Sequence, residues 1–134
     1  MTLSENVIYC IANMLLPVTL LMLGLVIWRT IPPYGSILGY KTSRSVKNPT
    51  LWNSAQHYFG KNCTITYTVL SVITLTAVLS SIFGTFDEKA LVIICTTAVI
   101  VNVAALFTVI GIVECKLKKI EHQNSTNGYN TNRF

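Results

Sequence analysis

Five basic side chains and no acidic one lie in a single stretch of the sequence, residues 29–61. They are Arg29, Lys41, Arg44, Lys47 and Lys61. Within this stretch, the segment 39–45 interleaves the cations with tyrosine, threonine and serine. Cationic groups and hydroxyls hold phosphates and carboxylates, because both donate hydrogen bonds to oxygen. We therefore expect residues 29–61 to bind an anionic group, carried by a lipid headgroup or by a partner protein.

The elements that must position this stretch are long and apolar. Residues 6–28, 62–86 and 90–113 carry no charge, and each run can cross a bilayer core of about 30 Å at about 1.5 Å per residue. The chain is 51% hydrophobic and 11% charged, whereas soluble proteins are roughly 25% charged. The sequence predicts an all-α integral membrane protein with three transmembrane helices. Residues 1–121 would form one membrane domain, followed by a polar, disordered tail at 122–134.

The distribution of charge predicts the orientation. Lys and Arg gather on the cytoplasmic side of a membrane, and here they concentrate in the loop 29–61 and after residue 113. The hairpin 87–89 holds one lysine beside two acids. We therefore expect a multi-pass protein of the cell membrane with its amino end outside and its carboxyl end in the cytoplasm. The first apolar run follows Glu5 and is too long for a cleaved signal peptide, so we expect it to be retained.

Several function classes are disfavoured. None of the three spans contains an acid, lysine or arginine, which argues against ion-coupled transport, since such mechanisms use charged groups within the membrane. His57 and His122 lie outside the spans, so they cannot ligate haem in a bundle. There is no catalytic triad or metal motif, and no cofactor is expected. The basic residues sit beside membrane spans, where orientation explains them better than nucleic-acid binding does.

The four cysteines show no metal-binding spacing, and apolar packing is their default role. Cys10 and Cys95 would share the outer half of the membrane. A disulfide between them stays an open alternative.

Small hydroxyl residues recur along one broad face of the second span. They include Thr64, Thr68, Ser71, Thr74 and Ser81. Such a face packs against protein, because small side chains allow close approach and hydroxyls bond across helix contacts. Its main interpretation is a helix–helix interface, which also permits self-association. The alternative is an intramembrane groove for a ligand or peptide, lined by Asn13, Thr68, Ser71, Thr74 and Asn102.

The second half of the loop predicts a short helix. Asn48 followed by Pro49 is typical of a helix cap and first position. Apolar residues then share one face of the segment 49–59, namely Leu51, Trp52, Ala55, Tyr58 and Phe59. We expect an amphipathic helix lying in the headgroup layer, anchored by Trp52 and Tyr58. In the plainest alternative, the basic residues only lie near anionic lipid.

The loop sequence PPYGSILGYKTSRSVKNPTLWNSAQHYFGK resembles the signature of the SdpI family, small bacterial membrane proteins named for an immunity protein. The matching positions are Pro32, Pro33, Gly39, Tyr40, Thr42, Arg44, Ser45, Lys47, Asn48, Trp52, Ala55, Gly60 and Lys61. Three positions depart from the pattern: Lys41 stands in place of an arginine, Gln56 in place of an asparagine or histidine, and Gly35 where an asparagine is common. Because lysine lacks the planar fork of arginine, it would grip a carboxylate or phosphate less firmly.

The resemblance implies a non-enzymatic membrane protein that protects against a membrane-active peptide toxin, or that relays a signal by binding a peptide or a cytoplasmic regulator. The binding residues that it implies in the motif loop are Gly39, Tyr40, Lys41, Thr42, Arg44, Ser45, Lys47, Asn48, Trp52 and Gln56. The alternatives are a lipid-headgroup-binding factor or enzyme that uses the basic loop, and a small transporter component.

Overall fold

Three long helices make up the protein in the computed structural model, which describes residues 3–84 and 87–131. They are α1 (Leu3–Arg29), α2 (Pro49–Phe83) and α3 (Glu88–Thr131). The described residues form no strand, and each helix contains a span long and apolar enough to cross a membrane. The predicted all-helical fold with three spans is confirmed. The predicted end of the second span, at 86, lies outside the described residues.

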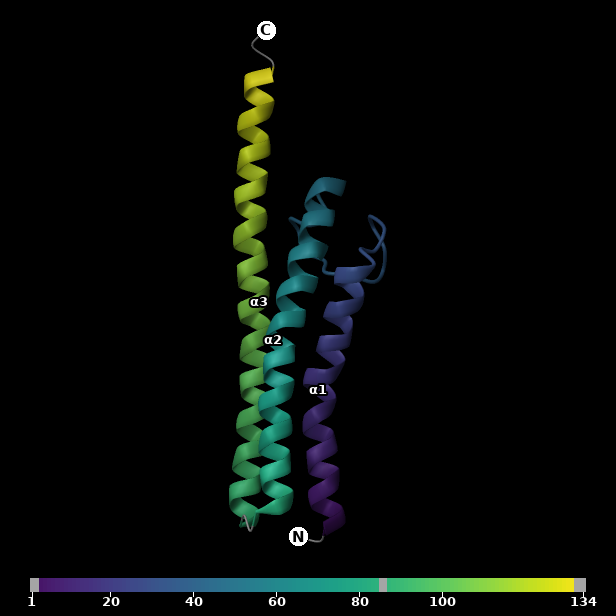
Figure 1. Cartoon of the computed structure of the whole chain (residues 1–134). Coiled ribbons are helices and arrows are strands. Elements are labelled where there is room, and N and C mark those ends of the chain that lie inside the picture. Colours follow the sequence, from purple (N-terminus) through teal and green to yellow (C-terminus); the bar gives the residue numbers. More distant parts are fainter. Residues whose placement is uncertain (1–2, 85–86, 132–134) are drawn as a thin grey trace.

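The helices run up, down and up, and α2 lies between α1 and α3 (Figure 1). The loop that joins α1 to α2 and the carboxyl half of α3 therefore lie at the same end of the bundle (Figure 1). At about 1.5 Å per residue, the 35 residues of α2 and the 44 of α3 are far longer than a bilayer core. Both helices are therefore longer than the crossing requires, and most of their charged residues lie toward the loop end.

The separate interfacial helix predicted at 49–59 is absent, because these residues form the first turns of the continuous helix α2. Its beginning is as predicted: the Asn48 side chain accepts a hydrogen bond from the Leu51 amide at 2.8 Å, and Pro49 follows. The prediction was wrong about the surroundings of the apolar face of this segment. Leu51, Trp52 and Ala55 are 1%, 0% and 0% exposed, so protein covers this face and no hydrophobic reason remains for the segment to lie flat on lipid.

Helix α3 continues well past the predicted third span. The polar segment that we expected to be a disordered tail is helical as far as Thr131, and residues 132–134 lie outside the described part. Because the buried Leu117 and the half-buried Ile120 pack into the core, the helix is held beyond residue 113 by tertiary contact as well as by local preference.

Two glycines of the α1–α2 interface allow the two helix backbones to approach each other closely. A Cβ added at Gly60 would lie 2.6 Å from the Trp28 backbone nitrogen, and one at Gly24 would lie 2.9 Å from the Cys63 Cβ. Helices in membranes associate through small residues, because lipid offers no hydrophobic driving force between them. This contact places Trp28 beside Gly60. Arg29 and Lys61, the next residue of each helix, therefore lie at about the same height along the bundle.

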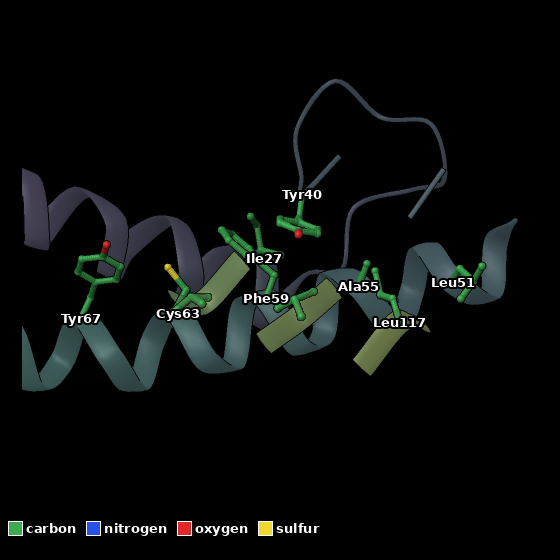
Figure 2. Packing of buried hydrophobic residues seen from close by; sticks show 10 residues of the cluster. Ile27, Tyr40, Leu51, Ala55, Phe59, Cys63, Tyr67 and Leu117 are labelled. Atoms are coloured by element: carbon green, nitrogen blue, oxygen red, sulfur yellow. The ribbon is translucent and has the colours of Figure 1, made fainter. Parts of the chain in front are cut away.

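The hydrophobic core follows one face of α2 from Leu51 to Tyr67 (Figure 2). Side chains from every other element meet that face. They are Ile27 of α1, Tyr40 of the loop, and Val109, Val113 and Leu117 of α3. The core is therefore concentrated at the loop end of the bundle, where it holds the functional candidates in place.

Candidate functional site

The motif loop is folded against helices at the end of the bundle where α2 begins. We call this region the cap, and define it as residues 30–60 together with residues 113–121 of α3. The cap begins at the level of Arg29 and Lys61 and contains all ten residues predicted to form the binding loop.

Gln56 and Tyr40 are joined by a reciprocal pair of hydrogen bonds. The Tyr40 amide donates to Gln56 Oε1 at 2.7 Å, and Gln56 Nε2 donates to the Tyr40 carbonyl oxygen at 2.7 Å. Gln56 is fully buried, and the Tyr40 ring stacks on Phe59 with centroids 4.7 Å apart. A glutamine thus satisfies both backbone groups of a buried loop residue, which an apolar side chain could not do. This contact fixes the loop to α2, and Figure 2 shows the Tyr40 ring beside Phe59 of that helix.

Gly39 allows the loop to approach Gln56. Its φ is +131°, a conformation that residues with a side chain rarely adopt. A Cβ there would also lie 2.8 Å from Gln56 Oε1 and 3.1 Å from the Pro32 ring. Both the backbone conformation and the available space therefore require glycine at this motif position.

Ser45 and Thr42 close a tight turn. The Thr42 amide donates to Ser45 Oγ at 2.8 Å, and the Ser45 amide donates to Thr42 Oγ1 at 3.3 Å. Ser45 is fully buried, and its hydroxyl lies within hydrogen-bond distance of the Tyr40 and Thr42 carbonyl oxygens. A loop lacks the backbone hydrogen bonds of a helix or sheet, and such side-chain bonds satisfy its backbone groups instead. These two hydroxyls support the loop from within.

Trp52 ties the exit of α1 to the start of α2. Its indole nitrogen donates to the Pro32 carbonyl oxygen at 2.8 Å, and its ring packs nearly perpendicular to the Tyr34 ring, with centroids 5.9 Å apart. The Tyr34 hydroxyl in turn donates to the Val46 carbonyl oxygen at 2.7 Å. Trp52, predicted to anchor the chain in lipid headgroups, is 0% exposed. Tyr58, the second predicted anchor, is half-buried, and Lys116 lies 4.4 Å from the centre of its ring.

Two carboxylates of α3 meet the cations of the loop. Arg44 lies 3.6 Å from Glu114 and 3.3 Å from Glu121, measured between nitrogen and oxygen atoms, and Lys47 pairs with Glu121. The Tyr40 hydroxyl donates to Glu114 Oε1 at 3.0 Å. These contacts link the loop to the carboxyl half of α3 through charge. The Arg44 and Lys47 side chains remain 35% and 51% exposed, so solvent or a partner can still reach them.

Two of these groups have pKa values that differ from their ordinary ones. Burial, followed by the hydrogen bond to Glu114, raises the pKa of the Tyr40 phenol well above its ordinary range. Tyr40 is therefore a neutral hydrogen-bond donor at physiological pH. The hydrogen bond from Lys47, together with the charges of Lys47 and Arg44, lowers the pKa of the Glu121 carboxyl from its ordinary 4.5. Glu121 is therefore ionised and paired at neutral pH.

Lys41 differs from the other motif residues. Its side chain is exposed, and no ion pair joins it to any residue in the described ranges 3–84 and 87–131. Of the motif cations inside the loop, Lys41 is therefore the one whose charge is not used by the cap itself. Those ranges also contain no cluster of three His, Cys, Asp or Glu side chains that could hold a metal ion.

The predicted intramembrane groove residues are only partly brought together. Asn13 and Thr74 line one small cavity between the helices, and Asn102 is buried one turn from Ala98, which also lines it. Thr68 is exposed and its hydroxyl bonds back to the Thr64 carbonyl oxygen. Ser71 is half-buried. The cavity measures about 20 Å³, which is the space of a single water molecule.

Glu114 and Glu121 are the site residues that sequence reasoning missed. They are two of only five acidic residues in the chain and stand seven positions apart, which places both on one face of a helix. That spacing, on a segment predicted to share a side with the basic loop, was a usable signal. The sequence does not show which loop side chains the two carboxylates meet, because those partners lie about 70 residues earlier in the chain.

Comparison with known proteins agrees with this architecture. The family model of the SdpI/YfhL protein family matches residues 30–114, from the exit of α1 to the glutamate that contacts Tyr40 and Arg44. Searches of curated proteins and of solved structures gave no match. Since the match covers more than half of the chain and includes the whole motif loop, the chain belongs to the SdpI/YfhL family of membrane proteins.

Proposed function

We propose that this protein is a non-enzymatic immunity or signal-relay protein of the bacterial cell membrane, which acts by binding a peptide or protein through the cap. In this proposal the amino end lies outside and the cap lies on the cytoplasmic side of the membrane. The concentration of Lys and Arg at the loop end supports that orientation, since basic segments resist translocation.

The observation that carries the proposal is the charged contact between the loop and α3. Arg44 and Lys47 are oriented by the Glu114 and Glu121 carboxylates and yet remain partly exposed. Exposed ion pairs contribute only about 0–1 kcal/mol each, so an acidic segment of a partner can displace these glutamates at small cost. Such an exchange would change how the carboxyl half of α3 is held, and so couples binding to a shape change.

The remaining motif groups support binding rather than catalysis. Gln56, Ser45 and Trp52 are fully buried and engaged in hydrogen bonds that hold the loop. A catalytic group must reach its substrate, whereas these side chains position the charged surface from behind. Lys41 projects from that surface with its charge unpaired, which suits direct contact with a partner.

The test is survival of a strain that lacks the native gene and carries the chain on a plasmid, challenged with culture supernatant of the toxin-producing parent strain. Lys41→Ala and Arg44→Ala should each reduce survival at unchanged protein level, because each removes a charge that the partner contacts. Ser43→Ala is the matched control, since Ser43 is an exposed neighbour in the same turn. Parental survival of both cation variants at parental abundance would contradict the proposal.

A further inference from the structure

The outer tip of the loop is strongly apolar. Ile37 is 92% exposed and Leu38 is 72% exposed, and Ile37 has the largest exposed fraction of any large hydrophobic side chain in the described residues. The hydrogen bonds of Tyr40 and Trp52 fix the loop on either side of these two residues, so the fold holds them outward. Two adjacent large hydrophobic side chains that are this exposed mark an interaction surface.

The position of the tip along the bundle can be derived from its contacts. Gly39 touches Gln56, which lies four residues before Gly60 on α2, a rise of about 6 Å. Gly60 itself packs on Trp28, beside the charged residues that end the apolar spans. The headgroup region of a bilayer adds roughly 5–7 Å on each side of the hydrocarbon core. With Gly60 at the edge of the hydrocarbon core, the apolar tip lies at the height of the lipid headgroups.

A groove runs from the tip down the outer wall of α1. Its volume is about 510 Å³, and it is lined by Thr19, Met22, Leu23 and Val26 of α1 and by Pro33 and Leu38 of the loop, among others. Met22 and Val26 are more than half exposed on the membrane-spanning part of α1, where the surrounding medium is lipid. The groove is therefore continuous with the lipid-facing surface at one end and covered by the loop at the other.

We propose that Ile37 and Leu38 insert into the bilayer interface, and that the groove beneath them holds one acyl chain of a phospholipid. The lining of the groove is almost wholly apolar, with only the hydroxyls of Thr19, Thr30 and Ser36 as polar side-chain groups. The Thr19 and Thr30 hydroxyls are already bonded to the Leu15 and Val26 carbonyl oxygens. This lining matches a hydrocarbon chain and offers little to a polar ligand. Arg29 and Lys41 are exposed and respectively precede and follow the groove-lining residues Thr30 and Leu38, by one and three positions, and cations at the membrane surface favour an anionic headgroup.

This inference is independent of the immunity proposal, because it concerns how the loop sits on the membrane and not what the cap recognises. It also replaces the lipid anchor predicted at Trp52 and Tyr58 with one made by the first half of the loop. Because Ile37 has almost no contact with the rest of the protein, its substitution tests membrane insertion without threatening the fold.

The experiment uses the full chain with its four cysteines changed to alanine and one new cysteine, either Ile37→Cys or the control Ser43→Cys. Each variant carries an environment-sensitive fluorophore and is reconstituted in vesicles of phosphatidylcholine and phosphatidylglycerol. A second set of vesicles contains phosphatidylcholine brominated in the acyl chain. The label at 37 should show a blue-shifted emission and be quenched by the brominated chains several-fold more strongly than the label at 43.

Equal quenching at the two positions would overturn the proposal. A blue shift at 37 without quenching, growing with the ratio of protein to lipid, would assign the tip to contact with a second copy of the chain and would also overturn it. As a separate readout of the groove, a phospholipid with a photoreactive acyl chain should label residues 33–38 in the parent. Val26→Trp, which fills the groove wall, should reduce that labelling several-fold, whereas unchanged labelling would contradict the assignment of the groove.

Discussion

The two ends of the helical bundle are built differently. At the cap end, large side chains such as Trp52, Leu51 and Tyr40 are buried, and buried polar groups such as Gln56 and Ser45 have partners. Toward the other end, apolar side chains of α1 and Val78 of α2 line a shallow depression that is open to the outside of the bundle. Polar atoms of Asn13, Ser71 and Asn102, in the membrane-spanning parts, are buried without a hydrogen-bond partner.

The solvent around each end explains this difference. The cap projects beyond the apolar spans, so burial of its side chains is driven by removal of apolar surface from water, at about 25 cal/mol per Å². Within the bilayer, lipid tails are as apolar as leucine, and helices associate through close packing and polar contacts alone. Burial of large side chains in the cap, and close approach at the small residue Gly24 in the spans, are the expected outcome when one chain folds in two solvents.

The largest expected effect comes from the point where the two regions join. Gly60→Leu should destabilise the protein by about 3 kcal/mol or prevent its accumulation, because the new side chain would overlap the Trp28 backbone, which cannot move aside. Thermal unfolding in detergent measures the change. Gly111→Leu is the control, since a Cβ at Gly111 meets nothing within 4 Å. Equal stability of both variants would show that α1 and α2 do not approach as described.

A change within the cap should have an intermediate effect. Gln56→Leu keeps a side chain of similar size but leaves the buried Tyr40 amide without its hydrogen-bond partner. The loss should lower the free energy of unfolding by about 2 kcal/mol. The melting temperature should fall, and hydrogen exchange at the Tyr40 amide should accelerate. Asn53→Leu, at an exposed position on the same helix, should leave both measurements near the parental values. Retained protection of Tyr40 in the Gln56 variant would show that this contact does not hold the loop.

The smallest expected effect concerns pH. Folding lowers the pKa of the Glu121 carboxyl from its ordinary value of 4.5. The ionised carboxylate therefore contributes stability that is fully present above pH 4.5. This stability is lost as the pH falls through the lowered pKa. Acidification below that ordinary pKa should therefore loosen α3 near residue 121. Amide hydrogen exchange near residue 121 should then become faster relative to exchange at Val113, a buried residue of the same helix. Glu121→Gln should show the looser state at neutral pH with little further change on acidification. A parental-like acid response in that variant would assign the effect to other groups.

Much of the candidate site could be predicted because its residues are adjacent in sequence. The loop motif runs through consecutive positions, and its turn residues, such as Gly39 and Asn48, have local backbone roles that a sequence displays directly. The roles of Gln56 and Trp52 were harder to predict, because a glutamine or tryptophan on an apolar face can contact lipid, solvent or protein. Nothing local decides among these surroundings. Glu114 and Glu121 were missed for the same reason, since their partners lie about 70 residues earlier in the chain.

The order of residues alone was sufficient for three features: the three spans, the helix start at Asn48 and Pro49, and the side on which positive charge gathers. Each depends on a run of neighbouring residues, because length, apolarity and capping are local properties. Only the packing of distant segments decided that the apolar face of 51–59 is covered by the loop and α3 instead of lipid, and that Arg44 and Lys47 are met by carboxylates. An amphipathic pattern shows that a face must be buried, but the identity of what buries it is a property of the folded chain.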